Sequence, residues 1–408
     1  MSFPLCGMEV KITYIPAKAY NIMQRFFLFL NMNSKDRKEY RYKRRKQKRI
    51  ESKIKKVQEN SFQTLLNPET LIRAFKKTKL NVGWKYSVQL FESRLLVNIF
   101  ELIQKLRNGE SVSKGFVCFK RNERGKTRDI KSVHISERVV QRAFCDNILN
   151  PILFPSVIYD SSASQKGKGV YFARKRLVEH LRRFYVKNGN SGYVLAVDFS
   201  KYFENIDHPV LYEKLEKFFL EPEAIKCIHY FVDCFGEKSL GLGSQISQVL
   251  AVIYLCKIDH YIKEVLKIKY YGRYMDDCYI ITKTKEELNF VLSKLKELCA
   301  EDKIILNSKK TRIYRTYDYF PFLKGLYKIL PSGKIIRKVH KSKIKREKQK
   351  LKKLHNLRVS KKEIRKNLVS WKGGLKGFNA WHSLKGIYKY NQKLNQGAEN
   401  DLSLEQKR

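Results

Sequence analysis

Two spacings of apolar residues divide the chain into expected helices and expected strands. Apolar residues recur every three to four positions from Val88 to Leu106 and from Glu286 to Leu298, which predicts amphipathic helices. Residues 61–110 as a whole have this helical character, and Asn67-Pro68 is a typical helix start. Short runs of β-branched and aromatic residues elsewhere predict strands.

Two of the strand runs flank an acidic pair. In Lys269–Thr282, aromatic and β-branched residues precede and follow Asp276-Asp277, a pattern typical of two strands joined by a tight turn. Adjacent carboxylates repel each other unless a cation lies near them, and Mg²⁺ is the usual cation because it prefers oxygen ligands. A solvated Asp-Asp turn fits this stretch, taken alone, equally well.

A second predicted strand ends in a carboxylate. Val194–Val197 is continuously apolar, as strands buried on both faces are, and Asp198 follows directly. A carboxylate there is costly unless it is paired or bound to a metal. If the strands of Asp198 and Asp276 are neighbours, the two carboxylates lie close together, as in two-metal nucleotidyl transfer. Asp207 is instead expected to cap a helix.

The segment Gly115–Ile135 predicts a strand, a turn and a second strand. Lys126 and Arg128 alternate along the second strand and so project from one face. Two cations on one face near a glycine turn suit a triphosphate. Solvated surface charges explain the same pattern equally well.

Further helices and turns are expected on both sides of these strands. Ser136–Leu153 predicts a helix closed by Pro151. The basic, glycine-rich turn Ser164–Gly169 leads into a helix from about Val170 to Tyr185 and could clamp a phosphate. In Leu240–Leu255 a glycine turn precedes a helix whose apolar face should bury against a sheet. Lys303–Arg312 predicts a strand that ends in a lysine pair.

The charge of the chain indicates its partner. The 408 residues include 85 Lys and Arg against 39 Asp and Glu, a net charge of +46. This points to a polyanion, and the 24 Tyr and 24 Phe favour nucleic acid over a membrane because aromatic rings stack on bases. Residues 31–58 (13 basic, 3 acidic) predict a solvated helix or a disordered arm; residues 334–366 (16 basic, 2 acidic) predict helices with a cationic face.

The cysteines and the apolar segments argue against secretion and membrane insertion. The eight cysteines form no CxxC pair and no cluster with zinc spacing. Several lie in apolar runs, as buried free thiols do, which favours a reducing, cytoplasmic location. Arg25–Leu30 is too short to span a bilayer and has the wrong position and flanks for a signal peptide, so it is expected to pack in a core.

Four ordered stretches together resemble the motifs of bacterial reverse transcriptases, in the branch that holds group II intron, retron, diversity-generating-retroelement and defence-associated enzymes. They are Gly125–Arg128 with Ser164–Gly169, Asp198–Phe203 with Ile206–His208, Leu242–Gln248, and Tyr274–Asp277. They follow the family order over about residues 115–330. This agreement favours a metal site at Asp276-Asp277 over a solvated turn.

The resemblance implies the fold class and the domains. The expected architecture is an α+β right-hand polymerase with fingers, a palm built on an antiparallel sheet, and a helical thumb. The implied domains are a basic N-terminal arm (1–60), fingers (61–190), palm (191–330), thumb (331–395) and a flexible tail (396–408).

The resemblance also implies roles for single residues. Asp198, Asp276 and Asp277 would be catalytic and, with the carbonyl of Phe199, would hold two Mg²⁺ ions, for which Mn²⁺ can substitute. Asp276 would be the more direct ligand of the pair, because neighbouring side chains on a strand point to opposite faces. The nucleotide would be bound by Lys126, Arg128, Phe203, Leu242, Gly243, Gln248 and Lys310. Nucleic acid would be contacted by Lys166, Lys168, Arg44, Arg45, Lys345 and Arg346.

Three of these assignments carry a specific expectation. Phe203 would be the steric gate that excludes a 2′-OH. Lys310, or Lys309 if the register differs, would assist the departure of pyrophosphate. Phe322–Gly325 resembles the turn that grips the primer, although Lys324 stands where the family usually has glycine.

The implied activity is synthesis of cDNA from dNTPs on an RNA template, expected to be a structured non-coding RNA. The pattern around Leu242-Gly243 and Ser247-Gln248 resembles error-prone diversity-generating-retroelement enzymes, and some defence-associated enzymes share it, so both roles stay open. No membrane partner is expected, whereas an oligomer or an accessory protein is compatible with the chain. Two alternatives also stay open: a non-templated or protein-primed DNA polymerase, and a catalytically silent RNA-binding maturase.

Overall fold

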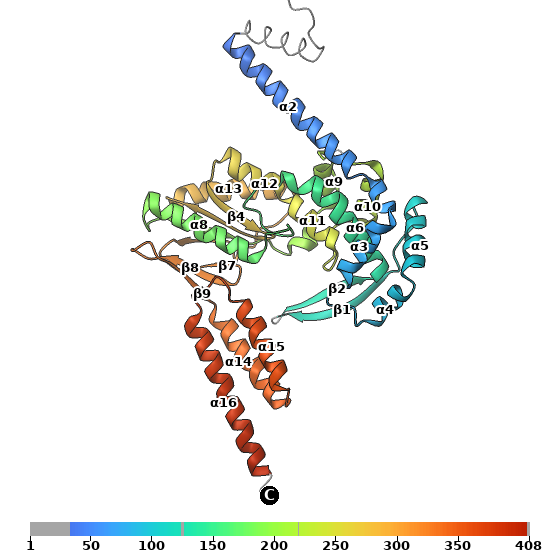
Figure 1. Ribbon diagram of the computed structural model, residues 1–408. Helices are drawn as coiled ribbons and strands as arrows, with labels where there is room; N and C mark the ends of the chain where they lie inside the picture. The colour runs from blue at the N-terminus through green and yellow to red at the C-terminus, as the bar shows by residue number, and fades with distance from the viewer. Residues whose placement is uncertain (1–32, 124–125, 219, 406–408) are drawn as a thin grey trace, which may run out of the picture. The chain divides into compact units, whose positions relative to one another are not determined.

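The computed structural model describes residues 33–123, 126–218 and 220–405 (Figure 1). The chain divides into two compact units, Met1–Glu59 and Asn60–Arg408. The expected packing segment Arg25–Leu30 lies outside the described residues. No helix in the described part of the chain is long and apolar enough to cross a bilayer.

The described part of the first unit is a single basic helix, α2 (Ser34–Glu59), none of whose residues is buried. Of the two alternatives for this run, the solvated helix is therefore confirmed. Its sequence contains no Gly or Pro, and Glu39 pairs with Lys43 one turn later at 2.8 Å. Arg44 and Arg45 are both exposed on it.

The second unit begins with three helices and a two-stranded sheet. As expected, Asn67 caps the first helix by accepting a hydrogen bond from the backbone N–H of Glu69, and Pro68 occupies the first turn. The two predicted strands are also present as an isolated antiparallel pair, whereas the turn at residues 124–125 lies outside the described residues. The elements are α3 (Pro68–Lys79), α4 (Tyr86–Ser93), α5 (Leu95–Arg107), β1 (Phe116–Glu123) and β2 (Lys126–Val133).

The helix that follows has the expected extent, within one residue, but is less regular than expected. It runs through α6 (Ile135–Phe144), a π-helical turn and α7 (Asn150–Leu153). The expectation that Pro151 closes it was wrong. Pro151 lies in the first turn of α7, directly after the π-helical turn, and the helical backbone continues past it to Leu153.

A four-stranded antiparallel sheet in the order β4-β5-β3-β6 forms the centre of this unit. One face packs against α8 (Val170–Asn188) in a cluster that includes Leu181, Phe184, Val194, Tyr279 and Ile281. Figure 1 shows α8 running along the sheet. The strands are β3 (Tyr193–Val197), β4 (Tyr270–Tyr274), β5 (Asp277–Thr282) and β6 (Arg312–Arg315).

Further helices lie between β3 and β4 in the chain, and another follows β5. Asp207 caps α9 by accepting from the N–H of Val210, as expected. The expected helix after the glycine turn is α11, and its residues Val249, Leu250 and Ile253 are buried. These elements are α9 (His208–Glu216), α10 (Pro222–Asp233), α11 (Gln245–Tyr254), α12 (Cys256–His260) and α13 (Lys285–Glu301).

The expectation of a strand over Lys303–Arg312 was wrong. Asn307 instead forms a turn, because its side-chain oxygen accepts from the N–H of Lys309 and its backbone oxygen accepts from the N–H of Lys310. The strand β6 begins only at Arg312. The lysine pair therefore lies in a turn before the strand rather than at its end.

A second, three-stranded sheet leads into the C-terminal helices. It comprises β7 (Phe320–Phe322), β8 (Gly325–Ile329) and β9 (Ile335–Val339). The helices expected over residues 334–366 begin only at Lys341, because the turn at Gly333, whose φ is +77°, returns the chain to pair with β8 and the residues before Lys341 form β9. The domain boundary expected at residue 330 falls in this turn.

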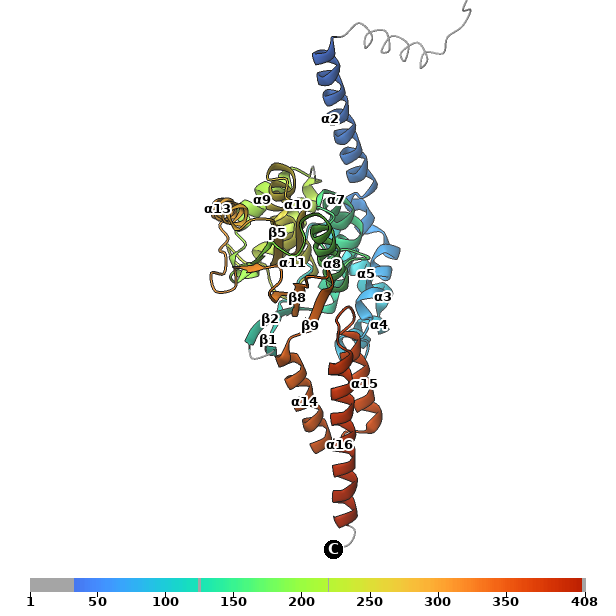
Figure 2. The same cartoon turned by 90° about the vertical axis from the view of Figure 1, so that its left-hand side faces the viewer.

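The remaining chain is helical. Helices α14 (Lys341–Asn356), α15 (Lys361–Gly373) and α16 (Trp381–Glu405) lie side by side in both views (Figures 1 and 2). They enclose a small core of Leu351, Ile364, Leu368 and Ile387. α16 continues to Glu405, so the segment expected to be a tail has helical backbone up to that residue. Mixed helices with antiparallel sheets give the α+β fold that was expected.

Candidate active site

The acidic pair lies on a hairpin, as the sequence predicts. Tyr274 and Asp277 form the last pair of β4 and β5, which leaves Met275 and Asp276 as a two-residue loop. Met275 has φ +53°, a conformation that costs a non-glycine residue roughly 1–2 kcal/mol. Its carbonyl accepts a hydrogen bond of 3.1 Å from the guanidinium of Arg273. The loop is therefore held in a strained but specific conformation.

Asp198 lies next to this hairpin. β3 and β5 are antiparallel neighbours whose last pair is Val197 with Cys278. Asp198 and Asp277 are the next residues in that register, so the strand ends bring them together. Asp198 is only 9% exposed. The expectation that the two acidic strand ends are neighbours is thus confirmed.

All three carboxylates line one large cavity. Its volume is about 1160 Å³, and it is bounded by strand ends, by α8 and by the loop that follows α15. Asp198, Asp276 and Asp277 share it with Phe203, Gln248, Lys309, Lys310 and Lys324. The cavity is large enough to hold a nucleotide together with the end of a nucleic-acid strand.

A lysine neutralises the first carboxylate. The Nζ of Lys310 donates to both oxygens of Asp198 at 2.8 Å. Asn307 Nδ2 donates to Asp198 Oδ2 at 3.1 Å, and the hydroxyl of Thr311 donates to the Asp198 carbonyl. Both carboxylate oxygens are therefore oriented by the turn that precedes β6.

The second carboxylate has an unusual pKa. Burial, followed by repulsion from Asp276 and Asp198, raises the pKa of Asp277 to about 7, although Lys310 and Lys324 oppose the shift. This mutual repulsion means that the three acidic groups act on one another electrostatically. A site that concentrates negative charge in this way has high affinity for cations.

The sequence places this geometry in a known family. A family model described as reverse transcriptase (RNA-dependent DNA polymerase) matches residues 118–326, slightly more than half of the chain. The chain belongs to the reverse transcriptase family. The matched segment contains the acidic hairpin, Asp198 and Lys310, and with them most of the residues that line the cavity.

The chain also has some similarity to solved telomerase structures, at low sequence identity. The chain is similar to apo telomerase from Candida tropicalis (14% identity, TM-score 0.46, covering 76% of this chain and 63% of that chain). It is also similar to telomerase from Candida albicans in complex with a fragment of telomeric RNA (12% identity, TM-score 0.44, covering 74% and 60%). The chain thus spans about three fifths of these telomerase chains. A comparison with curated proteins finds no match.

The carboxylates of this reverse transcriptase fold have the chemistry of a divalent-metal site. Carboxylate oxygens are the ligands that Mg²⁺ prefers, and carboxylates that repel one another, as Asp277 is repelled by Asp276 and Asp198, favour a cation between them. Within the described residues, no three His, Cys, Asp or Glu side chains already converge as in a formed metal site. The ammonium of Lys310 bonds to Asp198 instead. The donor set therefore fits a metal that would replace Lys310 at Asp198.

The residues expected to bind the nucleotide lie on several elements. Phe203 is half-buried and lines the cavity, and its carbonyl accepts from the N–H of Leu240 at 2.7 Å. Gly243 has φ +113°, and a Cβ on it would lie 3.4 Å from the carbonyl oxygen of Lys131 on β2. Leu242 is half-buried and is not among the described residues that line the cavity.

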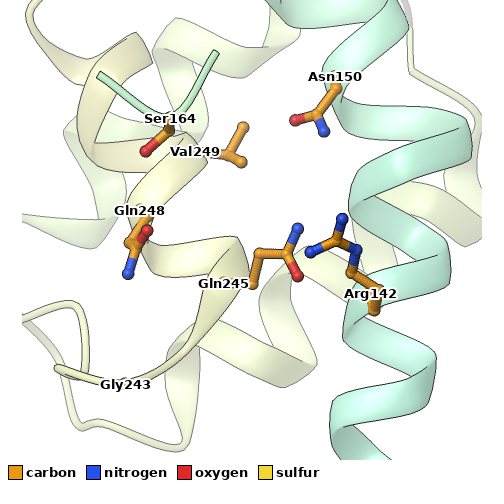
Figure 3. A pocket seen from close by; sticks show the side chains of 7 residues that line it. All are labelled: Arg142, Asn150, Ser164, Gly243, Gln245, Gln248 and Val249. Atoms are coloured by element: carbon orange, nitrogen blue, oxygen red, sulfur yellow. The ribbon is translucent and has the colours of Figure 1, made fainter. Parts of the chain in front are cut away.

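Gln248 connects the main cavity to a smaller polar pocket. This pocket, of about 320 Å³, lies between α11 and the α6–α7 region, and Figure 3 shows Gln245 of α11 pointing toward Arg142 across it. Gln248 is exposed and lines both cavities. Its expected position beside the nucleotide is compatible with this placement.

Lys126 and Arg128 lie on β2, opposite Glu123 and Arg121 of β1. Their role in holding a triphosphate stays a prediction. Phe199, whose carbonyl was expected to help hold metal, is buried and pairs through its backbone with Leu306.

The basic side chains expected to contact nucleic acid differ in exposure and in whether they already bond other protein groups. Lys166 and Lys345 are exposed. Lys168 instead turns inward, since its Nζ donates to the carbonyls of Tyr159 and Ser161, and burial lowers its pKa. Arg346 is exposed but bonds Ser342 one turn earlier. Lys168 is therefore better placed to hold its own turn than to contact phosphate.

The turn expected to grip a primer is also present. Leu323 and Lys324 form the two-residue loop between β7 and β8, with φ of +45° and +66°. Arg174 on α8 donates to the carbonyl of Leu323 at 2.8 Å and stacks on Phe378 at 4.3 Å. Lys324, where the family usually has glycine, lines the cavity and lowers the pKa of Asp277.

Sequence reasoning missed three supporting groups. Asn307, which orients Asp198, could have been found from the Asn-Ser pair that precedes the lysines, a common turn signal. Arg273 is a charge inside an otherwise apolar and aromatic strand, which is itself a signal of a buried partner. Its partner Asp259 gave no signal, because nothing in the sequence links the end of α12 to β4.

Proposed function

We propose that the protein is an RNA-directed DNA polymerase that makes cDNA from dNTPs on an RNA template. The observation that carries this proposal is the gathering of Asp198, Asp276, Asp277 and Lys310 on one cavity at the end of an antiparallel sheet. Family membership over residues 118–326 supports the same activity.

The cavity residues divide the work of nucleotidyl transfer. Asp198, Asp276 and Asp277, with the Phe199 carbonyl, would hold two Mg²⁺ or Mn²⁺ ions, which supply the charge that activates the primer hydroxyl and neutralises pyrophosphate. Lys310 leaves Asp198 and moves to the departing pyrophosphate. Lys126 and Arg128 hold the triphosphate, and Phe203 closes the space that a 2′-OH would need.

The same proposal extends to the domains. Residues 61–190 would form the fingers, 191–330 the palm and 331–395 the thumb. The helices α14 to α16 fit a thumb because they form a separate three-helix core beside the sheet β7-β8-β9. The first-unit helix α2 and the cationic face of α14 would bind the RNA backbone, since exposed Arg44, Arg45, Lys345 and Arg346 lie there.

The biological role belongs to the bacterial branch that the motifs resemble. We infer a dedicated, structured non-coding RNA as template, used in anti-phage defence or in a diversity-generating retroelement. The half-buried Leu242 supports low fidelity in particular, because it cannot make the hydrogen bonds of a glutamine. A cytoplasmic location is supported by the seven described cysteines, all of which are free thiols.

One experiment tests the proposed function. The protein is purified with its bound RNA and supplied with Mg²⁺ and dNTPs, and both the RNA and the product are sequenced. A product complementary to the bound RNA is expected. A DNA product that matches no RNA would favour the non-templated alternative. If no product forms and Asp276→Ala leaves the biological function unchanged, the silent maturase is favoured.

A further inference from the structure

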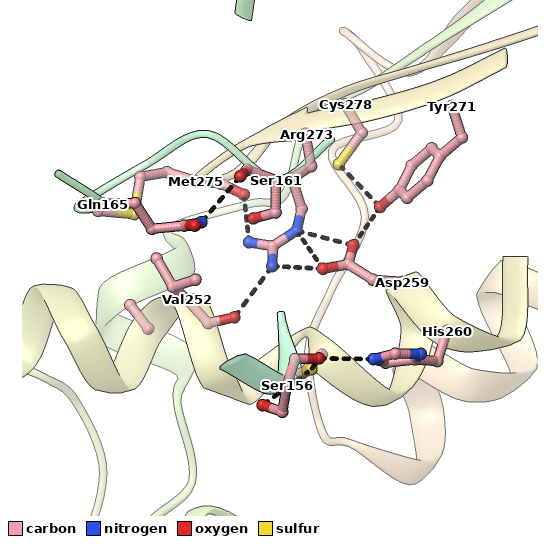
Figure 4. Close-up of polar contacts among 12 residues, drawn as sticks. Ser156, Ser161, Gln165, Val252, Asp259, His260, Tyr271, Arg273, Met275 and Cys278 are labelled. Atoms are coloured by element: carbon pink, nitrogen blue, oxygen red, sulfur yellow. Dashed lines mark hydrogen bonds and ion pairs between the residues drawn. The ribbon is translucent and has the colours of Figure 1, made fainter. Parts of the chain in front are cut away.

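A buried ion pair lies directly behind the acidic hairpin. Arg273 on β4 is 1% exposed and Asp259 at the end of α12 is fully buried. Nε of Arg273 lies 2.8 Å and 3.1 Å from the two carboxylate oxygens, and Nη2 lies 2.6 Å from the second. Figure 4 shows this fork-to-fork arrangement, with the hydroxyl of Tyr271 also bonded to Asp259 at 2.5 Å.

The rest of the guanidinium reaches two backbone carbonyls. Nη2 donates to Val252 of α11 at 2.9 Å, and Nη1 donates to Met275 in the hairpin loop at 3.1 Å. Arg273 therefore joins the helix that carries Gln248 to the loop that carries Asp276. Its own backbone pairs with Asp160 and Ser162 on the outer edge of the sheet, so the strand itself has little freedom.

The bond to Met275 acts where the backbone is strained. Met275 has positive φ without being glycine, so the loop needs support to keep this conformation. A buried ion pair is not in itself a strong source of stability, because desolvation of both charges offsets their attraction. An apolar pair of the same size could fill the space of Arg273 and Asp259. It could not donate a hydrogen bond to the Met275 carbonyl.

We propose that Arg273, fixed by Asp259, is a positioning residue that holds the Met275 carbonyl and thereby sets the direction of the Asp276 and Asp277 carboxylates. This inference rests on the proposed function, because the carboxylates are taken as its metal ligands, but Mn²⁺ binding tests it without DNA synthesis. It predicts that loss of the pair disorders the metal ligands more than it destabilises the fold.

The test separates an effect on the orientation of the carboxylates from an effect on the stability of the fold. Full-length wild type, Arg273→Lys and the double variant Arg273→Met/Asp259→Leu are titrated with Mn²⁺ alone and followed by electron paramagnetic resonance. Thermal denaturation and the kcat and KM for dNTP are measured in parallel. A second buried pair, Lys214 with Asp302 at 2.7 Å, provides the matched control Lys214→Met/Asp302→Leu.

Arg273→Lys and the Arg273→Met/Asp259→Leu variant are both expected to raise the Kd for Mn²⁺ about tenfold, a size typical of groups that orient metal ligands. kcat falls in proportion while the KM for dNTP stays unchanged. The apolar double variant melts near the wild-type temperature, and the control pair leaves the Kd for Mn²⁺ unchanged.

Two results overturn the proposal: wild-type Mn²⁺ affinity in Arg273→Met/Asp259→Leu, or an equal loss of affinity in the control pair. A wild-type protein that binds Mn²⁺ normally but makes no DNA overturns the proposed function alone.

Discussion

The ammonium of Lys310 lies 2.8 Å from both carboxylate oxygens of Asp198, 112 residues away in sequence. The ammonium thus lies where a metal ion bound to Asp198 would lie. The same lysine is the group expected to assist pyrophosphate. The positive charge of Lys310 can therefore neutralise the Asp198 carboxylate before the substrate arrives and the leaving pyrophosphate afterwards.

The bond to Asp198 predicts different roles for the neighbouring Lys309 and Lys310. Lys310→Ala is expected to lower the single-turnover rate of dNTP incorporation by roughly 100-fold, the usual effect of removing a group that acts on the leaving group. Lys309→Ala should cause a much smaller loss, because Lys309 also lines the cavity but Lys310 is the lysine that bonds Asp198. Rapid-quench measurement of one incorporation checks both. Equal losses would mean that the two lysines share the role.

The raised pKa of Asp277 predicts how metal-free stability depends on pH. Because its pKa of about 7 lies above that of the unfolded carboxyl, the folded state holds the proton more tightly between about pH 4 and pH 7. Stability contributed by this group is therefore lost as the pH rises through that window. Asp277→Asn should stabilise the metal-free protein at pH 8 by on the order of 2–4 kcal/mol and have little effect at pH 4.

Thermal denaturation in EDTA at pH 4, 6 and 8 measures this effect. Since metal ligands must be deprotonated, the affinity of wild type for Mn²⁺ should also fall as the pH drops below 7. An Asp277→Asn variant that is less stable than wild type at pH 8 would contradict the account.

Phe203 should control the choice of sugar. Its ring lines the cavity that holds the three carboxylates. Phe203→Val is expected to raise rNTP incorporation relative to dNTP at least about tenfold, because the variant no longer rejects the extra hydroxyl sterically. Competition between dNTP and rNTP in primer extension measures the ratio. The neighbouring Tyr202→Phe variant removes only a hydroxyl bonded to Ala251 and should leave the ratio unchanged.

The cationic face of α14 should bind RNA through phosphates. Lys345→Ala/Arg346→Ala is expected to weaken RNA binding for all sequences and to lower the slope of log K against log salt by roughly 1–2. Filter binding between 50 and 300 mM salt gives the slope. Lys285→Ala/Lys296→Ala removes the same charge from exposed positions on α13 and should change the slope less. Equal slopes would show that only net charge matters.

The positions of the acidic residues could be predicted from the sequence because they lie at the ends of recognisable strands. Val194–Val197 and the hairpin runs are short apolar strands, and their acidic ends meet because adjacent antiparallel strands share one edge. Capping at Asn67 and Asp207 was equally local, since each side chain bonds a backbone N–H two or three residues ahead.

The missed features depend on long-range partners. The turn at Asn307 replaces the expected strand because its groups bond Asp198 across the sheet, which no local pattern reveals. β9 forms because the turn at Gly333 returns the chain to β8, whereas charge alone suggested helix. Lys168 looked like a phosphate contact in sequence, yet its ammonium bonds Tyr159 and Ser161.

The central claim is tested most directly by extending a DNA primer on a heteropolymeric RNA template with Mg²⁺ and all four dNTPs, and sequencing the product. Wild type and Asp318→Asn, a variant of an exposed carboxylate outside the cavity, should make the complement of the template, and Asp276→Ala should make none. A product unrelated to the template, or one formed equally well by Asp276→Ala, would contradict RNA-directed DNA synthesis at this site.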